Sequence, residues 1–366
     1  MAQDTNIIIS PPRMIDLGCR DNESGTINCG HAFPDLARHQ DHFYLAFRSA
    51  PSHFPSKKSR IQIYRSADAQ KWQAEHSISG ALDIRDPQFL PFKGDLYLFY
   101  MGHSMQLFNH EPVHIYFIKR TADGWTEPVA LPFKQSGFWN VKTRDDKVYI
   151  SVYTRNGEQK RRVKRHFALY SSIDLKNCRS VFTSSITRER LRSYQTSESS
   201  FSFDAQGNIF GTIRSLIYPN INFAIDPDMP ADWDMQVDRF KCDGPKLFTH
   251  RESHYLVARR SAFYRLHTEP FRLFNGWRNL VNIVRYSLSK KRTALYRFDP
   301  QTLKISHIRD LPSHGDTGYS AVAPMDDNRF LLVYYSSPLE NMNDHDWLRG
   351  QIAGGTRLYA VTLSFS

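Results

Sequence analysis

One pattern recurs six times along the chain and limits the folds that are open to it. Each copy is a run of aromatic and aliphatic residues that follows a short polar turn, as in Phe43 to Arg48 after the turn at 39–42. Apolar runs joined by polar turns are typical of β-hairpins. The six runs occupy residues 43–48, 96–101, 148–153, 209–214, 255–260 and 330–335.

The spacing of these runs indicates how the hairpins are arranged. Repeats of roughly 40–60 residues with four strands each are typical of the blades of a β-propeller. The chain is therefore predicted to be an all-β, six-bladed β-propeller that forms a single domain, 1–366. Segments from both termini are expected to complete the last blade, because closure removes exposed sheet edges. The blades are expected to begin near residues 31, 85, 138, 196, 243 and 316.

One segment departs from the strand pattern. Apolar residues recur at helical spacing between Phe274 and Leu288, with arginines beside them. This predicts a helical insertion near residues 271–288, between the fifth and sixth runs. The insertion either packs on the side of the propeller or makes a peripheral membrane contact through its basic and apolar faces.

Composition restricts the partners. The chain carries 48 Lys and Arg against 37 Asp and Glu, a net charge of +11, which favours an anionic partner. No signature of a nucleic-acid-binding module is present, so an acidic carbohydrate is predicted rather than nucleic acid. The cysteines and histidines lack metal-site spacing, so neither a metal nor a cofactor is expected. With no apolar run of membrane-spanning length and no signal-peptide pattern at the start, we expect a cytoplasmic protein.

Three turns that follow blade strands carry a recognisable pattern. The segments Ser66 to Trp72, Thr121 to Trp125 and Ser172 to Cys178 resemble Asp-boxes, the Ser/Thr-x-Asp turns of sialidase (neuraminidase) propellers. The chain resembles a divergent member of that superfamily over roughly residues 30–340. In the family the Asp caps a hairpin turn, so this resemblance implies the fold and not the chemistry.

Two further segments resemble the active-site motifs of sialidases. Gly318-Tyr319-Ser320 stands where the family places its catalytic tyrosine, and Glu198 precedes Arg214 by a separation close to that between the family's catalytic glutamate and an arginine. The resemblance implies Tyr319 as nucleophile and Glu198 as its base. A free tyrosine titrates near ~10, so it needs an adjacent base to attack at neutral pH.

Arginines occupy one level of the repeat. When the six runs are aligned by their last residue, Arg48, Arg214 and Arg260 coincide in blades one, four and five. Guanidinium groups bind carboxylates bidentately, so this cluster is predicted to bind an acidic sugar, as the arginine triad of sialidases does. A shift of one residue in the alignment would replace Arg260 with Arg259.

The chain also departs from the sialidase pattern. Ala32 stands at the position of the family's first arginine, and the loop after the first run has no Asp where the family has its acid/base residue. His53 is the titratable group in that loop with a suitable pKa, and it is predicted, together with Arg85, to contact the substrate. Asp35 and Asp86, at the starts of blades one and two, are predicted substitutes for the acid.

These residues predict a sialidase-like glycoside hydrolase that acts on a terminal acidic sugar, either sialic acid or a related ulosonic or uronic acid. Two alternatives stay open. A non-catalytic propeller that binds anionic glycans would explain the missing arginine and Asp. A glycosidase with three carboxylates, Asp35, Asp86 and Glu198, would resemble the five-bladed arabinanase and invertase clan, which shares the Arg-Asp-Pro stretch.

Overall fold

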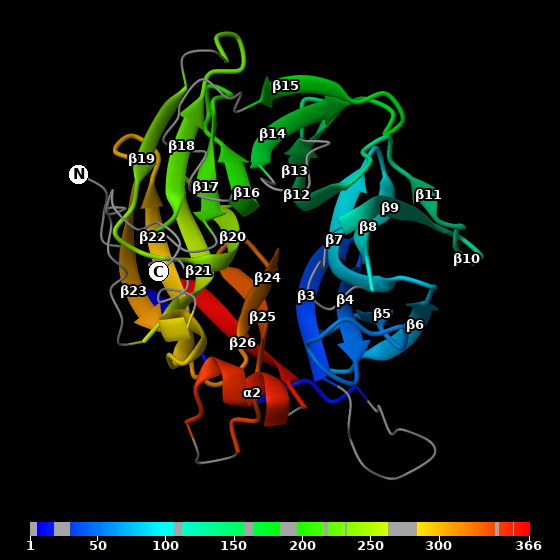
Figure 1. Cartoon of the computed structure of the whole chain (residues 1–366), viewed down its shortest axis with the longest axis vertical. Coiled ribbons are helices and arrows are strands. Elements are labelled where there is room, and N and C mark those ends of the chain that lie inside the picture. The colour runs from blue at the N-terminus through cyan, green and yellow to red at the C-terminus, as the bar shows by residue number, and fades with distance from the viewer. Residues whose placement is uncertain are drawn as a thin grey trace.

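The computed structural model describes residues 6–17, 30–105, 112–156, 164–183, 196–215, 219–230, 233–262, 284–340, 344–353 and 355–366. Six antiparallel sheets follow one another in chain order around an axis (Figure 1). The predicted all-β, six-bladed propeller is confirmed. The predicted insertion at 271–288 lies outside the described residues up to residue 283, and residues 284–287 form one helical turn.

The first strand of each sheet lies at the axis, and later strands lie progressively farther out (Figure 1). Blade one contains β3 (Gly30–His39), β4 (His42–Ala50), β5 (Arg60–Ser66) and β6 (Gln73–Ile78). Blade two contains β7 (Asp83–Phe92), β8 (Asp95–His103), β9 (Pro112–Thr121), β10 (Gly124–Trp125) and β11 (Val129–Ala130). Blade three contains β12 (Ser136–Arg144), β13 (Lys147–Asn156), β14 (Lys164–Ser172) and β15 (Arg179–Thr183). Blades four and five contain β16 (Thr196–Phe203), β17 (Ile209–Ser215), β18 (Ile221–Ile225) and β19 (Asp234–Val237); and β20 (Asp243–His250), β21 (Ser253–Ser261), β22 (Lys291–Asp299) and β23 (Lys304–Asp310).

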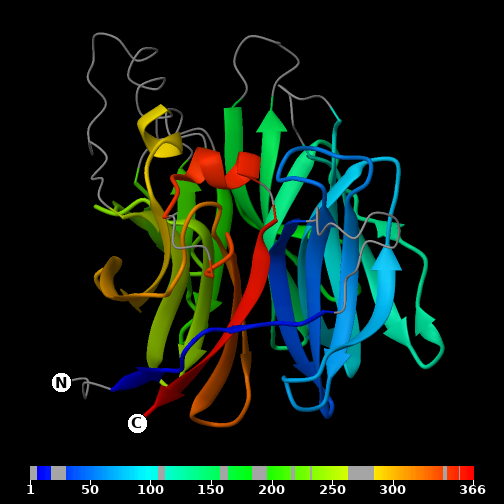
Figure 2. The ribbon, with the colours of Figure 1, turned by 90° about the horizontal axis from the view of Figure 1, so that it is seen from below.

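The sixth blade is assembled from both ends of the chain, as the sequence predicts. It contains β24 (Gly318–Pro324), β25 (Arg329–Ser336) and β26 (Arg357–Phe365), with the helix α2 (Trp347–Ala353) between β25 and β26. On the outer side, β1 (Ile7–Ile9) and β2 (Arg13–Met14) both pair with β26. The strand β1 consequently lies beside the C-terminal end of β26 (Figure 2).

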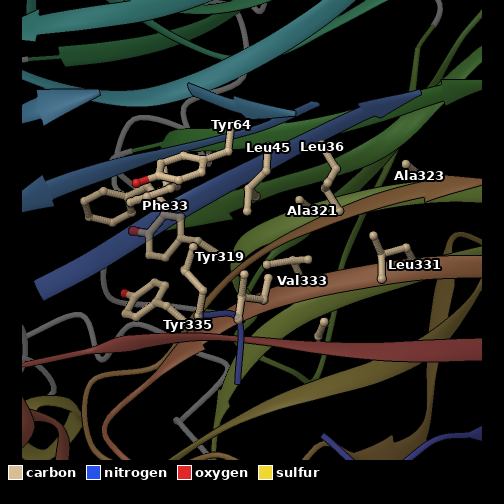
Figure 3. Packing of buried hydrophobic residues seen from close by; sticks show 14 of the residues in the cluster. Phe33, Leu36, Leu45, Tyr64, Tyr319, Ala321, Ala323, Leu331, Val333 and Tyr335 are labelled. Atoms are coloured by element: carbon tan, nitrogen blue, oxygen red, sulfur yellow. The ribbon is translucent and has the colours of Figure 1, made fainter. Parts of the chain in front are cut away.

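The hydrophobic core is divided among the interfaces between blades. Within the described residues, six clusters of buried side chains occur, each built mainly from two neighbouring sheets, and the cluster between blades six and one also includes Trp139 of blade three. At the closing interface, Leu45 and Phe47 of blade one pack in one cluster with Ala321 and Val333 of blade six (Figure 3). Because every sheet is covered on both faces, its strands are rich in apolar residues throughout.

The three Asp-box-like turns differ in their hydrogen bonding. The carboxylates of Asp68 and Asp174 each accept hydrogen bonds from the backbone N–H groups two and three residues later, at 2.8–2.9 Å. Asp123 accepts no such bond within the described part of the chain, and there Thr121 Oγ1 donates to the Gly124 carbonyl at 3.2 Å. Two of the three turns are therefore closed by their aspartate.

Across the described ranges, none of the helices is long and apolar enough to cross a membrane.

Removing residues 1–14 should destabilise the propeller. The deletion takes β1 and β2 from β26, which leaves the backbone of β26 as an open sheet edge available for association. We expect a lower melting temperature by calorimetry and concentration-dependent oligomers by size-exclusion chromatography. The control is Ile8→Ser, because Ile8 is 59% exposed in the same strand. Equal stability of the deletion variant and the full chain would contradict this role of the N-terminus.

Candidate active site at the propeller axis

A β-bulge lies near the start of every innermost strand. Pairing with the second strand of the blade shifts between residues 32 and 35, 85 and 88, 138 and 140, 196 and 199, 243 and 246, and 318 and 320. At four of these bulges the backbone is left-handed, at Phe33 (φ 54°), Asp86 (φ 55°), Gly244 (φ 58°) and Tyr319 (φ 44°). Bulges redirect side chains, and left-handed backbone at non-glycine residues clusters at functional sites. The bulges therefore indicate a candidate functional site at the axis.

Tyr319 and Glu198 meet across this axis. The Tyr319 hydroxyl donates a hydrogen bond of 2.7 Å to Glu198 Oε1. The second oxygen, Oε2, accepts the N–H of Gly244 at 2.8 Å, and the Arg214 guanidinium forms an ion pair with the same carboxylate. Because β16 and β24 belong to blades that are not neighbours, packing within a blade does not account for this contact. The structure thus brings together the pair that the sequence selects.

The Tyr319 side chain is enclosed by aromatic rings. Its ring centroid lies 4.7 Å from that of Phe33 and 5.1 Å from that of Trp139, and it stacks on Tyr335 at 6.0 Å (Figure 3). Burial and the charge of Glu198 raise the pKa of the Tyr319 phenol well above its usual value, against the opposing effect of Arg214 and Arg259. The resting phenol is therefore protonated, and Glu198 is positioned to accept its proton.

Three basic side chains surround a second buried carboxylate, that of Asp243. Lys241 Nζ and Arg214 Nε lie 2.5 and 2.7 Å from its Oδ1, and Arg259 Nη2 lies 3.4 Å from its Oδ2. Burial alone would raise the pKa of Asp243, but these three cations hold it well below its usual range. Burial would lower the pKa of Arg214, and Asp243 and Glu198 reverse that effect. Both guanidinium groups thus stay charged beside Tyr319, whose ring centroid lies 5.4 Å from Arg259 Cζ.

Asp86 lines the same pocket as Tyr319. Trp139, Lys246 and Ser320 line it as well. The Asp86 side chain is buried, and within the described residues no group donates a hydrogen bond to its carboxylate. Burial raises its pKa to about 7, and the negative charge of Glu198 adds to that effect. Asp86 can therefore hold or release a proton near neutral pH.

Asp35 is not brought to the Tyr319–Glu198 pair. Its carboxylate accepts hydrogen bonds from Lys246 Nζ at 2.5 Å and from the backbone N–H of Phe89 at 2.7 Å. Lys246 also donates to Gln88 Oε1 at 3.0 Å. Asp35 thus fixes Lys246, and it is Lys246 that lines the pocket.

Arg48, Arg85 and His53 lie on the Phe33 side of the pair. Arg48 is 1% exposed, and Arg48 and Arg85 share the carboxylate of Asp83, at 2.8 Å from Arg48 Nη2 and 2.7 Å from Arg85 Nε. The His53 ring packs edge-on against Phe33 at 5.3 Å, and its Nδ1 lies 2.8 Å from a carboxylate oxygen of Asp316. Among the described residues, no hydrogen bond or ion pair joins any of these three side chains to Tyr319 or Glu198, and His53 is linked through Asp316 to Trp347.

The prediction for Arg260 is wrong, and Arg259 takes its place. Neighbouring residues on a strand point to opposite faces. Arg259 pairs in register with Asp243 at the axis, whereas Arg260 forms a two-pronged ion pair with Asp310 of β23, at 2.8 and 2.6 Å. Aligning the runs by their last residue misplaces the fifth blade, because its run ends one residue past the partner of the bulge: Arg259 pairs with Asp243, as Arg48 pairs with Ala32 in the first blade.

Sequence reasoning missed Lys241, Asp243 and Trp139. A usable signal is the residue-proline pair at the bulge of three blades: Phe33-Pro34, Asp86-Pro87 and Gly244-Pro245. Aligning these pairs places Asp243 directly before the fifth bulge and Lys241 two residues earlier, on the same face. Within the described residues, no three His, Cys, Asp or Glu side chains gather as a metal site would require.

Among known proteins, no family model matches the chain, and no curated protein matches its sequence. In structure it is similar to a protein of unknown function from Dyadobacter fermentans, with 14% identity and a TM-score of 0.70, over 98% of this chain and 99% of that one. It is also similar to the sialidase of Trypanosoma rangeli, with 13% identity and a TM-score of 0.59, over 96% of this chain and 59% of the sialidase. A structure of that sialidase with sialic acid matches equally, at a TM-score of 0.59 and 13% identity over 96% of this chain and 58% of that one. The chain thus has a divergent sialidase-like propeller fold and spans about three fifths of the sialidase.

Asp86→Asn should stabilise the folded protein above neutral pH. The native pKa of about 7 lies above the ordinary value of 3.8, so the buried charge opposes folding once the pH exceeds that ordinary value. The gain should be largest above pH 7, on the order of a few kcal/mol, and should vanish as the pH falls toward 4. Urea unfolding between pH 4 and 8 measures it. A gain that does not depend on pH would contradict the raised pKa.

Proposed function

We propose that this protein is a glycoside hydrolase of the sialidase type that removes a terminal acidic sugar from a glycan. The observation that carries the proposal is the 2.7 Å contact between Tyr319 and Glu198, with Arg214 on the same carboxylate and Arg259 beside the phenol ring. The sialidase-like fold supports it. The positively charged guanidinium groups favour a sugar that carries a carboxylate.

The proposed reaction has two steps. First, Tyr319 Oη bonds to the anomeric carbon as the glycosidic C–O bond breaks, Glu198 accepts the phenol proton, and Asp86 gives its proton to the leaving oxygen. Next, Asp86 takes a proton from water, the water oxygen bonds to the anomeric carbon, and the tyrosyl bond breaks while Glu198 returns its proton. The anomeric configuration is retained, because each step inverts it once.

The resting charges suit this scheme. A neutral phenol can approach an anionic sugar without repulsion, and its proton moves to Glu198 only as the new bond forms. Asp86, with a pKa of about 7, holds a transferable proton at neutral pH. Phe33 and Trp139 supply apolar faces on which a sugar ring can pack.

Tyr319→Phe should reduce hydrolysis of 4-methylumbelliferyl glycosides of N-acetylneuraminic, ulosonic and uronic acids by about a thousandfold or more, because it deletes the nucleophile. Tyr335→Phe is the matched control, since it removes a neighbouring buried hydroxyl that lies 3.3 Å from Asp316. Melting temperatures verify folding. A fully active Tyr319→Phe would favour direct carboxylate chemistry by Asp86 and Glu198. Acidic sugars that bind but are never released would favour the non-catalytic propeller.

Asp86→Asn should remove acid catalysis selectively. Hydrolysis of natural-type glycosides with poor leaving groups should fall by about 100- to 10,000-fold, while nitrophenyl glycosides, whose leaving groups need no proton, should lose much less in the first step. In the unsubstituted protein kcat/KM should decline above pH 7 as Asp86 loses its proton. The measurement is a pH profile with both substrate types. The same loss for both leaving groups would exclude Asp86 as the acid.

A further inference from the structure

The arginine that lies beside Tyr319 is covered. Arg259 is 1% exposed, so no ligand can reach its guanidinium in this arrangement. Two aromatic side chains from different blades lie over it. Tyr286 comes from the segment between β21 and β22 of blade five, and Trp347 is the first residue of α2 in blade six.

Tyr286 makes polar contacts with the basic residues below it. Arg259 Nε donates to its hydroxyl at 3.3 Å. The face of its ring receives Lys291 Nζ at 3.2 Å and Lys241 Nζ at 4.7 Å from the centroid, and such ring faces are electronegative. One aromatic side chain thus provides weakly negative partners for three cations at once.

Trp347 completes the cover. Its indole lies 4.9 Å from Arg259 Cζ and packs edge-on against Tyr286 at 5.6 Å. Its Nε1 donates to Asp316 at 3.1 Å, and its backbone N–H donates to the Ser289 carbonyl at 3.3 Å. The helical turn at 284–287 and α2 lie on the same side of the molecule (Figure 2). Each side chain is therefore held by the other and by a few polar contacts.

The cluster beneath contains more basic than acidic side chains. Arg214, Arg259, Lys241 and Lys291 are accompanied by the carboxylates of Asp243 and Glu198, and Asp316 lies at the edge of the cap. Among the described residues, Lys291 Nζ donates to the uncharged oxygens of Ser261, Ser289 and Tyr286. Burial, with Arg259 next to it, lowers the pKa of Lys291 to about 6, and burial lowers that of Lys241 to about 8. Buried cations in excess are stabilised by an anion.

We propose that Tyr286 and Trp347 are a cap over the basic side chains of Arg259 and Lys241, which covers them when no anion is bound and turns aside when an acidic group binds. In the closed arrangement the Tyr286 hydroxyl accepts a hydrogen bond from Arg259. When the cap turns aside, a carboxylate oxygen of the ligand takes the place of this hydroxyl. That the anion is the carboxylate of an acidic sugar rests on the proposed function; the cap itself does not.

Chemical labelling of arginines tests the cap without any enzyme assay. Phenylglyoxal modifies accessible guanidinium groups, and mass spectrometry of the peptides gives the rate for each arginine. Tyr286→Ala should raise the labelling rate of Arg259 at least about tenfold, while Tyr286→Phe, which loses only the hydroxyl, should raise it less. Arg48 is the internal reference, because it is also 1% exposed and its guanidinium is held by Ser52, Phe54 and Asp83 and not by either cap residue.

Selective labelling of Arg259 over Arg48 supports the cap. An unchanged Arg259 rate in Tyr286→Ala at an unchanged melting temperature overturns it. If Tyr286→Ala loosens the whole protein and labels Arg48 as well, Trp347→Phe decides, because it keeps a ring while removing the N–H that bonds to Asp316. A selective rise in that variant supports the cap, and an unchanged rate there overturns it.

A second arm separates the cap from the proposed substrate. N-acetylneuraminic acid and sodium acetate are added to Tyr286→Ala during labelling. Protection of Arg259 by both identifies a carboxylate site, and stronger protection by the sugar supports the proposed function. Faster labelling that neither compound slows leaves the cap standing, but it overturns the carboxylate site beneath it.

Discussion

Closure of six sheets into a ring is the constraint on which the rest of this structure depends. Closure places β3 of the first blade beside β24 of the last, with β1 and β2 from the N-terminus completing the outer side of that blade. Once the ring is closed, the innermost strands of all six blades face one axis. Side chains that are far apart in sequence, such as those of Glu198 and Tyr319, then meet without any local packing rule. The bulges near the strand starts turn side chains toward the axis. In regular strands these side chains would instead point alternately into the interfaces between blades.

This convergence of side chains on the axis buries charged groups. Asp243 and Glu198 are nearly inaccessible, and Arg214 bridges them by pairing with both. Removing one partner of such a set leaves an uncompensated buried charge, which destabilises more than the pair stabilises. Arg214 is therefore a structural residue as well as a candidate ligand for an anion, and loss of binding in an Arg214 variant would not separate the two roles. Arg259 pairs with Asp243 at 3.4 Å and otherwise donates to the uncharged oxygens of Thr317 and Tyr286, so it gives the cleaner test.

The fold and the pair of Tyr319 and Glu198 could both be predicted from the sequence, but from different features. Six aromatic runs at blade spacing predict six sheets because each sheet in the ring is covered on both faces, one by each neighbouring sheet. Tyr319 and Glu198 were selected through motif resemblance, and the fold then accounts for their meeting. The error at Arg260 is one of register, since the end of a run does not say which of two adjacent side chains faces the axis. The role of Asp35 was missed because its partner, Lys246, lies 211 residues away.

The two carboxylates near Tyr319 differ in a way that sorts their roles. Glu198 accepts hydrogen bonds from the Tyr319 hydroxyl and the Gly244 N–H and pairs with Arg214. Asp86 has no hydrogen-bond donor among the described residues, and Arg85 and Arg48, the cations that favour its charge, are both engaged by Asp83. Two neighbouring carboxylates are not readily charged together. We therefore propose that the proton of the resting site is on Asp86, with Asp86 as acid and Glu198 as base, because the different environments of two carboxylates assign their roles.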